Sequence, residues 1–181
     1  MHQAPARFLV ESMHLLPRGL VLDVAAGSGR NALYLAKHGL TVHAVDRSAE
    51  ALETVQAAAR ERHLSSVTTA VVDLESMLLP QQVFSPAAYD AVIVFFYLFR
   101  PLFPALLRTL KPGGMLMYET FLIDNYLRYQ RPRHQEFCLA QGELRTLASG
   151  LHVLHYDEGR RESKDGQRET YTARLLARKE D

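Results

Sequence analysis

Short apolar runs alternate with amphipathic stretches along most of this 181-residue chain. The apolar runs are typical of buried parallel strands, and the stretches between them have helical periodicity. The predicted strands are Leu20–Val24, Thr41–Val45, Val67–Val72, Ala88–Phe95 and Met115–Thr120. The predicted helices are Arg30–His38, a helix capped by Ser48 that runs to Arg62, and Phe103–Leu110. This alternation predicts an α/β fold with a doubly wound parallel sheet.

Both ends of the chain add to this pattern. A short helix is expected over Ala4–Leu16, before Pro17 and Gly19. The C-terminal part predicts one helix and two strands, which are Gln141–Ser149, His152–Arg160 and Glu169–Arg178. Asp165 and Gly166 mark a hairpin between these strands, so one antiparallel strand is expected at or near the sheet edge. The polar, arginine-rich stretch Asp124–Gln135 interrupts the alternation, and residues 1–181 are expected to form a single domain.

The composition of the chain excludes some classes of binding partner and indicates the cellular compartment. The formal charge of +1 is too balanced to indicate nucleic acid or an anionic membrane as the main partner. A single cysteine, Cys138, excludes an internal disulfide framework and fits a reducing cytoplasm. No apolar run reaches the roughly 18–20 residues of a membrane span. The start of the chain lacks the pattern of a signal peptide. We therefore expect a cytoplasmic protein without a membrane partner.

Acidic residues follow three consecutive predicted strands. They are Asp23, Asp46 and Asp73, and Glu119 lies on the fifth strand. One such acid is often a helix cap or a solvated turn. A series of them indicates a ligand site, because ligands of open α/β sheets bind at the carboxyl ends of the strands.

A glycine turn follows the first of these acids. Gly27, Ser28 and Gly29 allow a ligand to approach the backbone closely, and with Ala32 they match a loose dinucleotide-binding pattern. Asp46 lies 17 residues after Gly29, where a ribose-binding acid is expected. Asp23 separates the possible cofactors, because a carboxylate at this turn repels a pyrophosphate. S-adenosylmethionine has no phosphate and carries an ammonium and a sulfonium, so Asp23 favours this cofactor over a dinucleotide. A nicotinamide oxidoreductase is therefore disfavoured.

The Asp-Val-Ala-Ala-Gly-Ser-Gly segment at 23–29 resembles the first motif of class I S-adenosylmethionine-dependent methyltransferases. This resemblance covers nearly the whole chain and implies a Rossmann-like seven-stranded sheet in the order 3-2-1-4-5-7-6. It implies S-adenosyl-L-methionine as cofactor and S-adenosyl-L-homocysteine as product. It also implies acids for the ribose hydroxyls and the adenine at Asp46 and Asp73. The full set of expected cofactor-binding residues is Asp23, Ala25, Gly27, Ser28, Gly29, Asn31, Asp46, Arg47, Asp73, Leu74 and Phe95.

A narrower resemblance concerns the acceptor side. Tyr-Leu-Phe-Arg-Pro at 97–101, Glu-Thr-Phe at 119–121 and the run from Arg131 to Leu144 resemble small bacterial methyltransferases of the tellurite-resistance type. We therefore expect in-line methyl transfer to a small acceptor, anionic or thiol-type. The Asn/Asp-Pro-Pro-Tyr motif of amino-methyltransferases acting on DNA bases and some proteins is absent after the fourth strand, which disfavours those acceptors.

The candidate catalytic residues each have two interpretations. Glu119, His134 and Tyr97 are candidate proton acceptors, and Arg131 and Arg133 would attract an anionic acceptor or close a lid over it. As structural residues, Glu119 would be a hydrogen-bonded strand-end acid, His134 a surface histidine and the arginines a solvated loop face. The histidines have no zinc-ligand spacing, so no metal is expected.

Two functions of different classes remain open from the sequence. The first is a methyltransferase for a small molecule. The second is a non-catalytic module that keeps the fold and the cofactor site but acts on a partner. The intact acids at Asp23, Asp46 and Asp73 argue against decay of the cofactor site but not against such a use.

Overall fold

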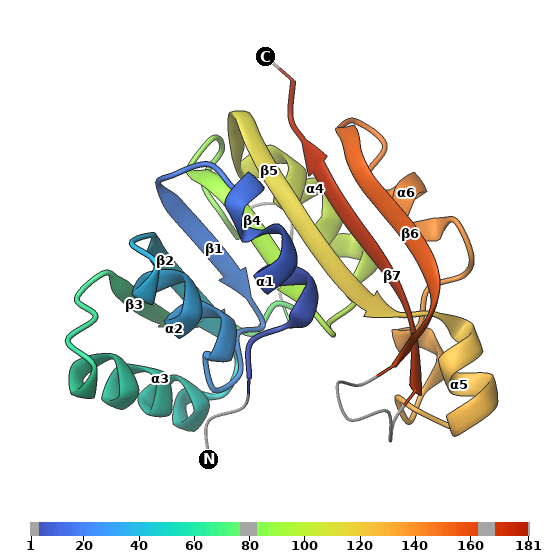
Figure 1. Ribbon diagram of the computed structural model, residues 1–181, viewed down its shortest axis with the longest axis horizontal. Coiled ribbons are helices and arrows are strands. Elements are labelled where there is room, and N and C mark those ends of the chain that lie inside the picture. The colour runs from blue at the N-terminus through green and yellow to red at the C-terminus, as the bar shows by residue number, and fades with distance from the viewer. Residues whose placement is uncertain (1–3, 77–82, 163–168, 181) are drawn as a thin grey trace.

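A computed structural model describes residues 4–76, 83–162 and 169–180. Its described strands form one seven-stranded sheet in the order β3-β2-β1-β4-β5-β7-β6 (Figure 1). The strands are β1 (Leu20–Val24), β2 (Thr41–Asp46), β3 (Val67–Val71), β4 (Tyr89–Phe95), β5 (Leu110–Phe121), β6 (His152–Glu162) and β7 (Glu169–Arg178). The first five run parallel, whereas β7 is antiparallel to both β5 and β6. The predicted fold class and strand order are confirmed.

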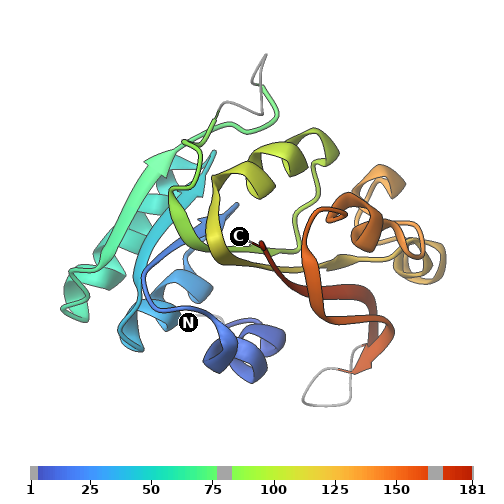
Figure 2. The ribbon, with the colours of Figure 1, turned by 90° about the horizontal axis from the view of Figure 1, so that it is seen from above.

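Helices cover both faces of the sheet. The described helices are α1 (Arg7–Ser12), α2 (Arg30–Lys37), α3 (Ala49–Glu61), α4 (Phe103–Thr109), α5 (Ile123–Tyr129) and α6 (Glu143–Leu147), with short 3-10 turns at Met13–Leu15, Arg100–Leu102 and Gln135–Phe137. One face packs against α1, α2 and α3 through residues such as Phe8, Leu35 and Val55. The other face packs against α4 and α6 through residues such as Leu106 and Leu144 (Figure 2). No described helix is long and apolar enough to cross a membrane.

Most predicted boundaries agree with the structure to within one or two residues. The strands Leu20–Val24 and Glu169–Arg178 match β1 and β7 residue for residue. Ser48 caps α3 as expected, because its side-chain oxygen accepts a hydrogen bond of 3.1 Å from the backbone N–H of Ala51. The Asp165–Gly166 turn lies outside the described residues.

Three predicted segments differ from the structure. The stretch Asp124–Gln135 was expected to interrupt the alternation, and it begins inside helix α5, which was not predicted. The third strand was expected to be buried, but Val71 is 60% exposed because β3 lies at the edge of the sheet, where the expected strand order also places it. The fifth strand was expected to begin at Met115, but β5 begins at Leu110 and includes residues 111–114, and its pairing with β4 shifts register between Tyr89 and Ala91. The backbone of this segment also bonds to Lys179 just beyond β7, which an isolated turn would not do.

The carboxyl ends of the parallel strands meet at the lower edge of the sheet in Figure 1. The start of β7 reaches the same edge, since Glu119 pairs with Arg174 and Phe121 with Thr172. The chain before α1 also lies there, because the backbone N–H of Ala6 donates to Oδ1 of Asn31 at 2.9 Å. Strand ends, the N-terminal segment and the β6–β7 pair therefore surround one edge of the sheet, where an α/β fold places its ligand.

Candidate active site

The glycine turn after β1 is held against the end of β2. The backbone N–H of Gly27 donates to Oδ2 of Asp46 at 2.8 Å. Gly27 and Gly29 both have positive φ, of 54° and 74°. A Cβ on Gly27 would have no heavy atom within 4 Å, whereas one on Gly29 would lie 2.5 Å from Cγ2 of Val55 on α3. Gly29 is therefore required for the packing of α2 on α3, and Gly27 leaves open space beside the turn.

Asp46 connects the glycine turn to the start of α3. Besides the bond from Gly27, its Oδ1 accepts a hydrogen bond of 2.9 Å from the backbone N–H of Ser48. Two backbone donors thus fix the orientation of this carboxylate. Each oxygen keeps a further lone pair for a ligand hydroxyl.

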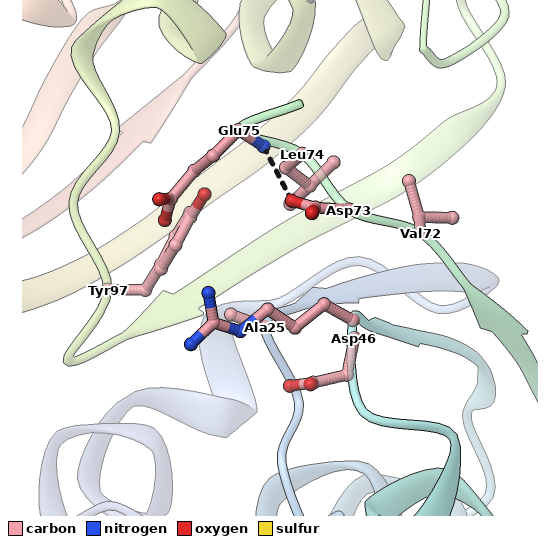
Figure 3. Close-up of a pocket in the computed structure, with 8 residues that line it drawn as sticks. Ala25, Asp46, Val72, Asp73, Leu74, Glu75 and Tyr97 are labelled. Atoms are coloured by element: carbon pink, nitrogen blue, oxygen red, sulfur yellow. Dashed lines mark hydrogen bonds between the residues drawn. The ribbon is translucent and has the colours of Figure 1, made fainter. Parts of the chain in front are cut away.

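A cavity of about 210 Å³ lies at the ends of β1, β2 and β3. Figure 3 shows Asp46 and Ala25 on one side of it, and Val72, Asp73 and Leu74 on the other. The cavity is lined by Ala25, Asp46, Arg47, Val72, Asp73, Leu74, Glu75 and Tyr97. The structure thus brings together six predicted site residues from four separate segments of the chain.

Val72 and Glu75 line this cavity but were not predicted as site residues. Oδ1 of Asp73 accepts a hydrogen bond of 3.1 Å from the backbone N–H of Glu75, which turns the chain around the carboxylate. The signal that points to such a turn is Asp73 itself, because an Asp side chain commonly accepts a hydrogen bond from the backbone two residues further on.

Asp23 is a buried acid next to this cavity. It is 2% exposed, and its Oδ2 has no hydrogen-bond partner among the described residues. Burial raises the pKa of Asp23 to about 7, and the nearby Asp46 adds to the rise, while the Ala32 amide and the Arg30 charge oppose it. A buried carboxylate oxygen without a hydrogen-bond partner is costly unless a ligand supplies a donor or a positive charge. Asp23 therefore favours a cationic group beside the glycine turn.

The segment after β4 contributes Tyr97 to the cavity. The Tyr97 ring lies beside the Glu75 carboxylate (Figure 3). Burial raises the pKa of the Tyr97 hydroxyl, and the Glu75 charge raises it further. The hydroxyl therefore stays protonated at neutral pH and can donate a proton in a hydrogen bond rather than remove one. Phe95, the last residue of β4, is 7% exposed and belongs to the core instead of the cavity lining.

Glu119 is engaged in a buried ion pair. Its Oε1 accepts hydrogen bonds from Oγ1 of Thr172 at 3.0 Å and from Nε of Arg174 at 2.9 Å. The Glu119 residue is 3% exposed. This environment matches the structural interpretation of a hydrogen-bonded strand-end acid. A free carboxylate for proton transfer would need to leave Arg174.

Several other predicted site residues lie outside the cavity lining. Arg131, Arg133 and His134 are exposed on the loop after α5, and the ring of His134 lies 6.0 Å from that of Phe137. Ser28 is exposed beside a different cavity. The side chain of Asn31 holds the N-terminal segment through the Ala6 amide.

Comparisons with known proteins agree with this architecture. A family model described as a methyltransferase domain matches residues 21–114, which is 94 of the 181 residues and includes all three strand-end acids before β4. Protein-L-isoaspartate O-methyltransferase of Ruegeria sp. (strain TM1040) is 32% identical to this chain over 139 residues. That match covers 77% of this chain but only 62% of the relative, so the chain spans less than two thirds of the relative's length.

Solved structures with the same fold come from distant proteins. TehB from Haemophilus influenzae superposes with a TM-score of 0.79 at 22% identity, covering 95% of this chain and 61% of TehB. A SAM-dependent methyltransferase from Methanosarcina mazei superposes with a TM-score of 0.73 at 20% identity, covering 93% of this chain and 96% of that one. At these identities the likeness shows a shared fold.

Proposed function

The chain belongs to the class I S-adenosylmethionine-dependent methyltransferases, and we propose that it methylates a small acceptor that reaches the site as an anion or a thiol. We infer this class of methyl acceptor from the environments of the three residues that could remove a proton from it. Glu119 is paired with Arg174, Tyr97 stays protonated, and His134 lies on an exposed loop. An acceptor that needs no proton removed is compatible with such a site.

The residues around the cavity fit the family's cofactor. The orphaned Oδ2 of Asp23 suits the ammonium of S-adenosylmethionine, directly or through a water molecule. The fixed carboxylate of Asp46 suits the two ribose hydroxyls. Asp73 and Leu74 lie across the cavity, where they would hold the adenine, and Tyr97 closes that side.

The acceptor's electron pair forms the new bond to the methyl carbon while the carbon–sulfur bond breaks and its electrons stay on sulfur. The chain's own contribution is to align the two reactants and to keep water out. Phe96, directly after β4, is 39% exposed, and the centroid of its ring lies 5.1 Å from that of the Phe121 ring. These two rings would form an apolar wall beside the reacting groups.

Basic residues and the sequence relatives support an anionic acceptor. The loop that carries Arg131 and Arg133 follows α5, directly beyond the carboxyl end of β5 (Figure 1). Its start is fixed by a hydrogen bond of 2.7 Å from Nδ2 of Asn125 to the carbonyl of Arg131. The curated relatives are named for O-methylation of L-isoaspartate in proteins, and they support the anionic character of the acceptor, since a carboxylate is an anion, but not its small size.

An acceptor panel tests this proposal. The protein is incubated with S-adenosylmethionine and small thiols, carboxylates, chalcogen oxyanions, amines or phenols at neutral pH, and S-adenosylhomocysteine formation is measured. We expect turnover with members of the first three groups. An amine or phenol as the best acceptor would contradict the proposal. Cofactor binding without turnover in any group would also contradict it and would favour the non-catalytic module.

Replacing Arg131 and Arg133 together with alanine should separate acceptor attraction from cofactor binding. We expect kcat/KM for an anionic acceptor to fall about tenfold, since two cations are lost near the acceptor's approach. The affinity for S-adenosylmethionine should not change. The matched control is Arg18→Ala with Arg60→Ala, which removes the same charge from exposed positions elsewhere. If both double variants lose the same amount of kcat/KM, Arg131 and Arg133 are only solvated residues of the loop.

A further inference from the structure

A second cavity lies beside the glycine turn, at the start of α2. Its volume is about 200 Å³, and it shares no lining residue with the cavity that contains Asp46 and Tyr97. Three cationic side chains contribute to its wall, together with Ser28 and Tyr34. They are Arg30 and Lys37, from the two ends of α2, and Arg62, which follows α3. Positive charges from separate segments therefore surround one small space.

None of these three cations forms an ion pair within the described part of the chain. No carboxylate lines the cavity. Lys37 and Arg62 form neither an ion pair nor a side-chain hydrogen bond with another described residue. Arg30 has a long hydrogen bond of 3.4 Å to the carbonyl of Ala4, a contact of 5.6 Å with the Phe96 ring and an electrostatic interaction with Asp23 that is not an ion pair. Like charges around a shared space repel one another, and a bound anion would offset that repulsion.

A second arginine-rich cavity shows what an internally compensated cluster looks like. It lies between α1 and the β6–β7 pair and is lined by Arg7, Arg160, Arg161, Arg174 and Glu162. Each of its arginines has a carboxylate partner among the described residues: Arg7 pairs with Glu11, Arg160 with Glu162 and Glu169, Arg161 with Asp157, and Arg174 with Glu119. An anion there would have to displace existing partners. The cluster beside α2 differs from this one because none of its cations has an ion-pair partner among the described residues.

We propose that the cavity beside α2 binds a phosphoryl group, either as inorganic phosphate or on a small organic phosphate. Guanidinium, ammonium and hydroxyl donors suit a tetrahedral dianion. Helix α2 adds to the positive potential, since its N-cap residue Gly29 has no capping side chain and its first turn has no acid. A volume of about 200 Å³ is below the usual size of drug-sized pockets, so the ligand is small.

Arg30 connects this cavity to the cofactor site. Its charge opposes the rise in the pKa of Asp23, and its guanidinium lies over Phe96. A phosphoryl group on Arg30 would offset that charge, so Asp23 would be less ionised at neutral pH. We therefore expect the bound anion to weaken S-adenosylmethionine binding. This consequence rests on the proposed cofactor role of Asp23, whereas anion binding itself does not.

Calorimetric titration with inorganic phosphate and with phenyl phosphate, at constant ionic strength, tests the site. We expect saturable binding with a dissociation constant of about 1 mM or lower, and at least about tenfold weaker binding in the Lys37→Gln/Arg62→Gln variant. The control variant Arg7→Gln/Arg160→Gln loses the same charge from the compensated cluster and should bind phosphate like the wild type. Tighter binding of phenyl phosphate would assign the site to an organic phosphate, and equal binding to the free ion.

The same variants distinguish a wrong assignment of the phosphate site from a wrong assignment of the cofactor site. Saturating phosphate should weaken S-adenosylmethionine binding about fivefold in the wild type and not in the Lys37→Gln/Arg62→Gln variant. Absence of saturable phosphate binding, or equal loss in both double variants, would overturn the proposal even if S-adenosylmethionine still binds. Weaker S-adenosylmethionine binding in Lys37→Gln/Arg62→Gln without phosphate would overturn it too, because the cavity would then belong to the cofactor site.

Discussion

The Asp46→Ala variant is expected to bind S-adenosylmethionine at least about 100-fold more weakly than the wild-type chain, because two charge-assisted hydrogen bonds to the ribose are lost. The carboxylate is already oriented by the Gly27 and Ser48 amides, at 2.8 and 2.9 Å. Its removal therefore takes away an acceptor that needs no reorganisation when the ligand arrives. Calorimetric titration measures the change in affinity.

The fold of this variant should survive. Loss of the acceptor for two backbone donors is expected to lower the free energy of unfolding by about 1–2 kcal/mol, which thermal denaturation can measure. Asp46→Asn keeps an acceptor oxygen and should lose less affinity. Glu53→Ala removes an exposed carboxylate from α3 and should behave like the wild type. Wild-type affinity in a folded Asp46→Ala protein would eliminate the ribose role.

The Asp23→Asn variant is expected to lose about 30-fold in affinity for S-adenosylmethionine, because the pairing of a buried carboxylate with the ligand's ammonium is removed. The same substitution should stabilise the ligand-free protein at pH 8 by about 2 kcal/mol, since it removes a buried negative charge whose Oδ2 has no hydrogen-bond partner among the described residues. A residue that strengthens ligand binding while it destabilises the empty protein has the signature of a ligand-binding group. Denaturant unfolding and titration on the same samples measure both effects.

The pH dependence follows from the direction of the Asp23 shift. Burial raises its pKa from 3.8 in an unfolded chain to about 7 in the folded one. The contribution of Asp23 to the free energy of unfolding is therefore fully present below about pH 4 and is lost as the pH rises through about 7. Cofactor affinity should change in the opposite sense and increase over that range. Both trends should be absent in Asp23→Asn and unchanged in Glu53→Gln. Parallel trends in Asp23→Asn and wild type would assign them to another group.

Local sequence signals were sufficient for most of the fold. Apolar runs predicted the strands, and Ser48 predicted the start of α3, because a cap depends on residues only three positions apart. Helix α5 was missed because it leads into a run of polar and charged residues at 130–136, although Ile123, Tyr126 and Tyr129 repeat at helical spacing. The edge position of β3 depends on strand order, which periodicity does not contain.

The candidate site was predictable where it depends on strand ends. The carboxyl ends of parallel strands share one edge, so Asp46 and Asp73 were expected together and line one cavity. Contacts between segments that are far apart in the chain could not be predicted from the sequence in the same way. Glu119 meets Arg174 only because β5 and β7 pair in one particular register. Asn31 is engaged by the backbone of Ala6, which has no side-chain signal in the sequence.

The charge complementarity of the glycine turn is the central claim, and parallel calorimetric titrations with S-adenosylmethionine, S-adenosylhomocysteine and NADH test it most directly. Asp23 lies buried at that turn without a partner for its Oδ2. We predict dissociation constants in the micromolar range, about −8 kcal/mol, for the two adenosyl compounds and no measurable binding of NADH. Binding of NADH, or no binding of any of the three, would contradict the account.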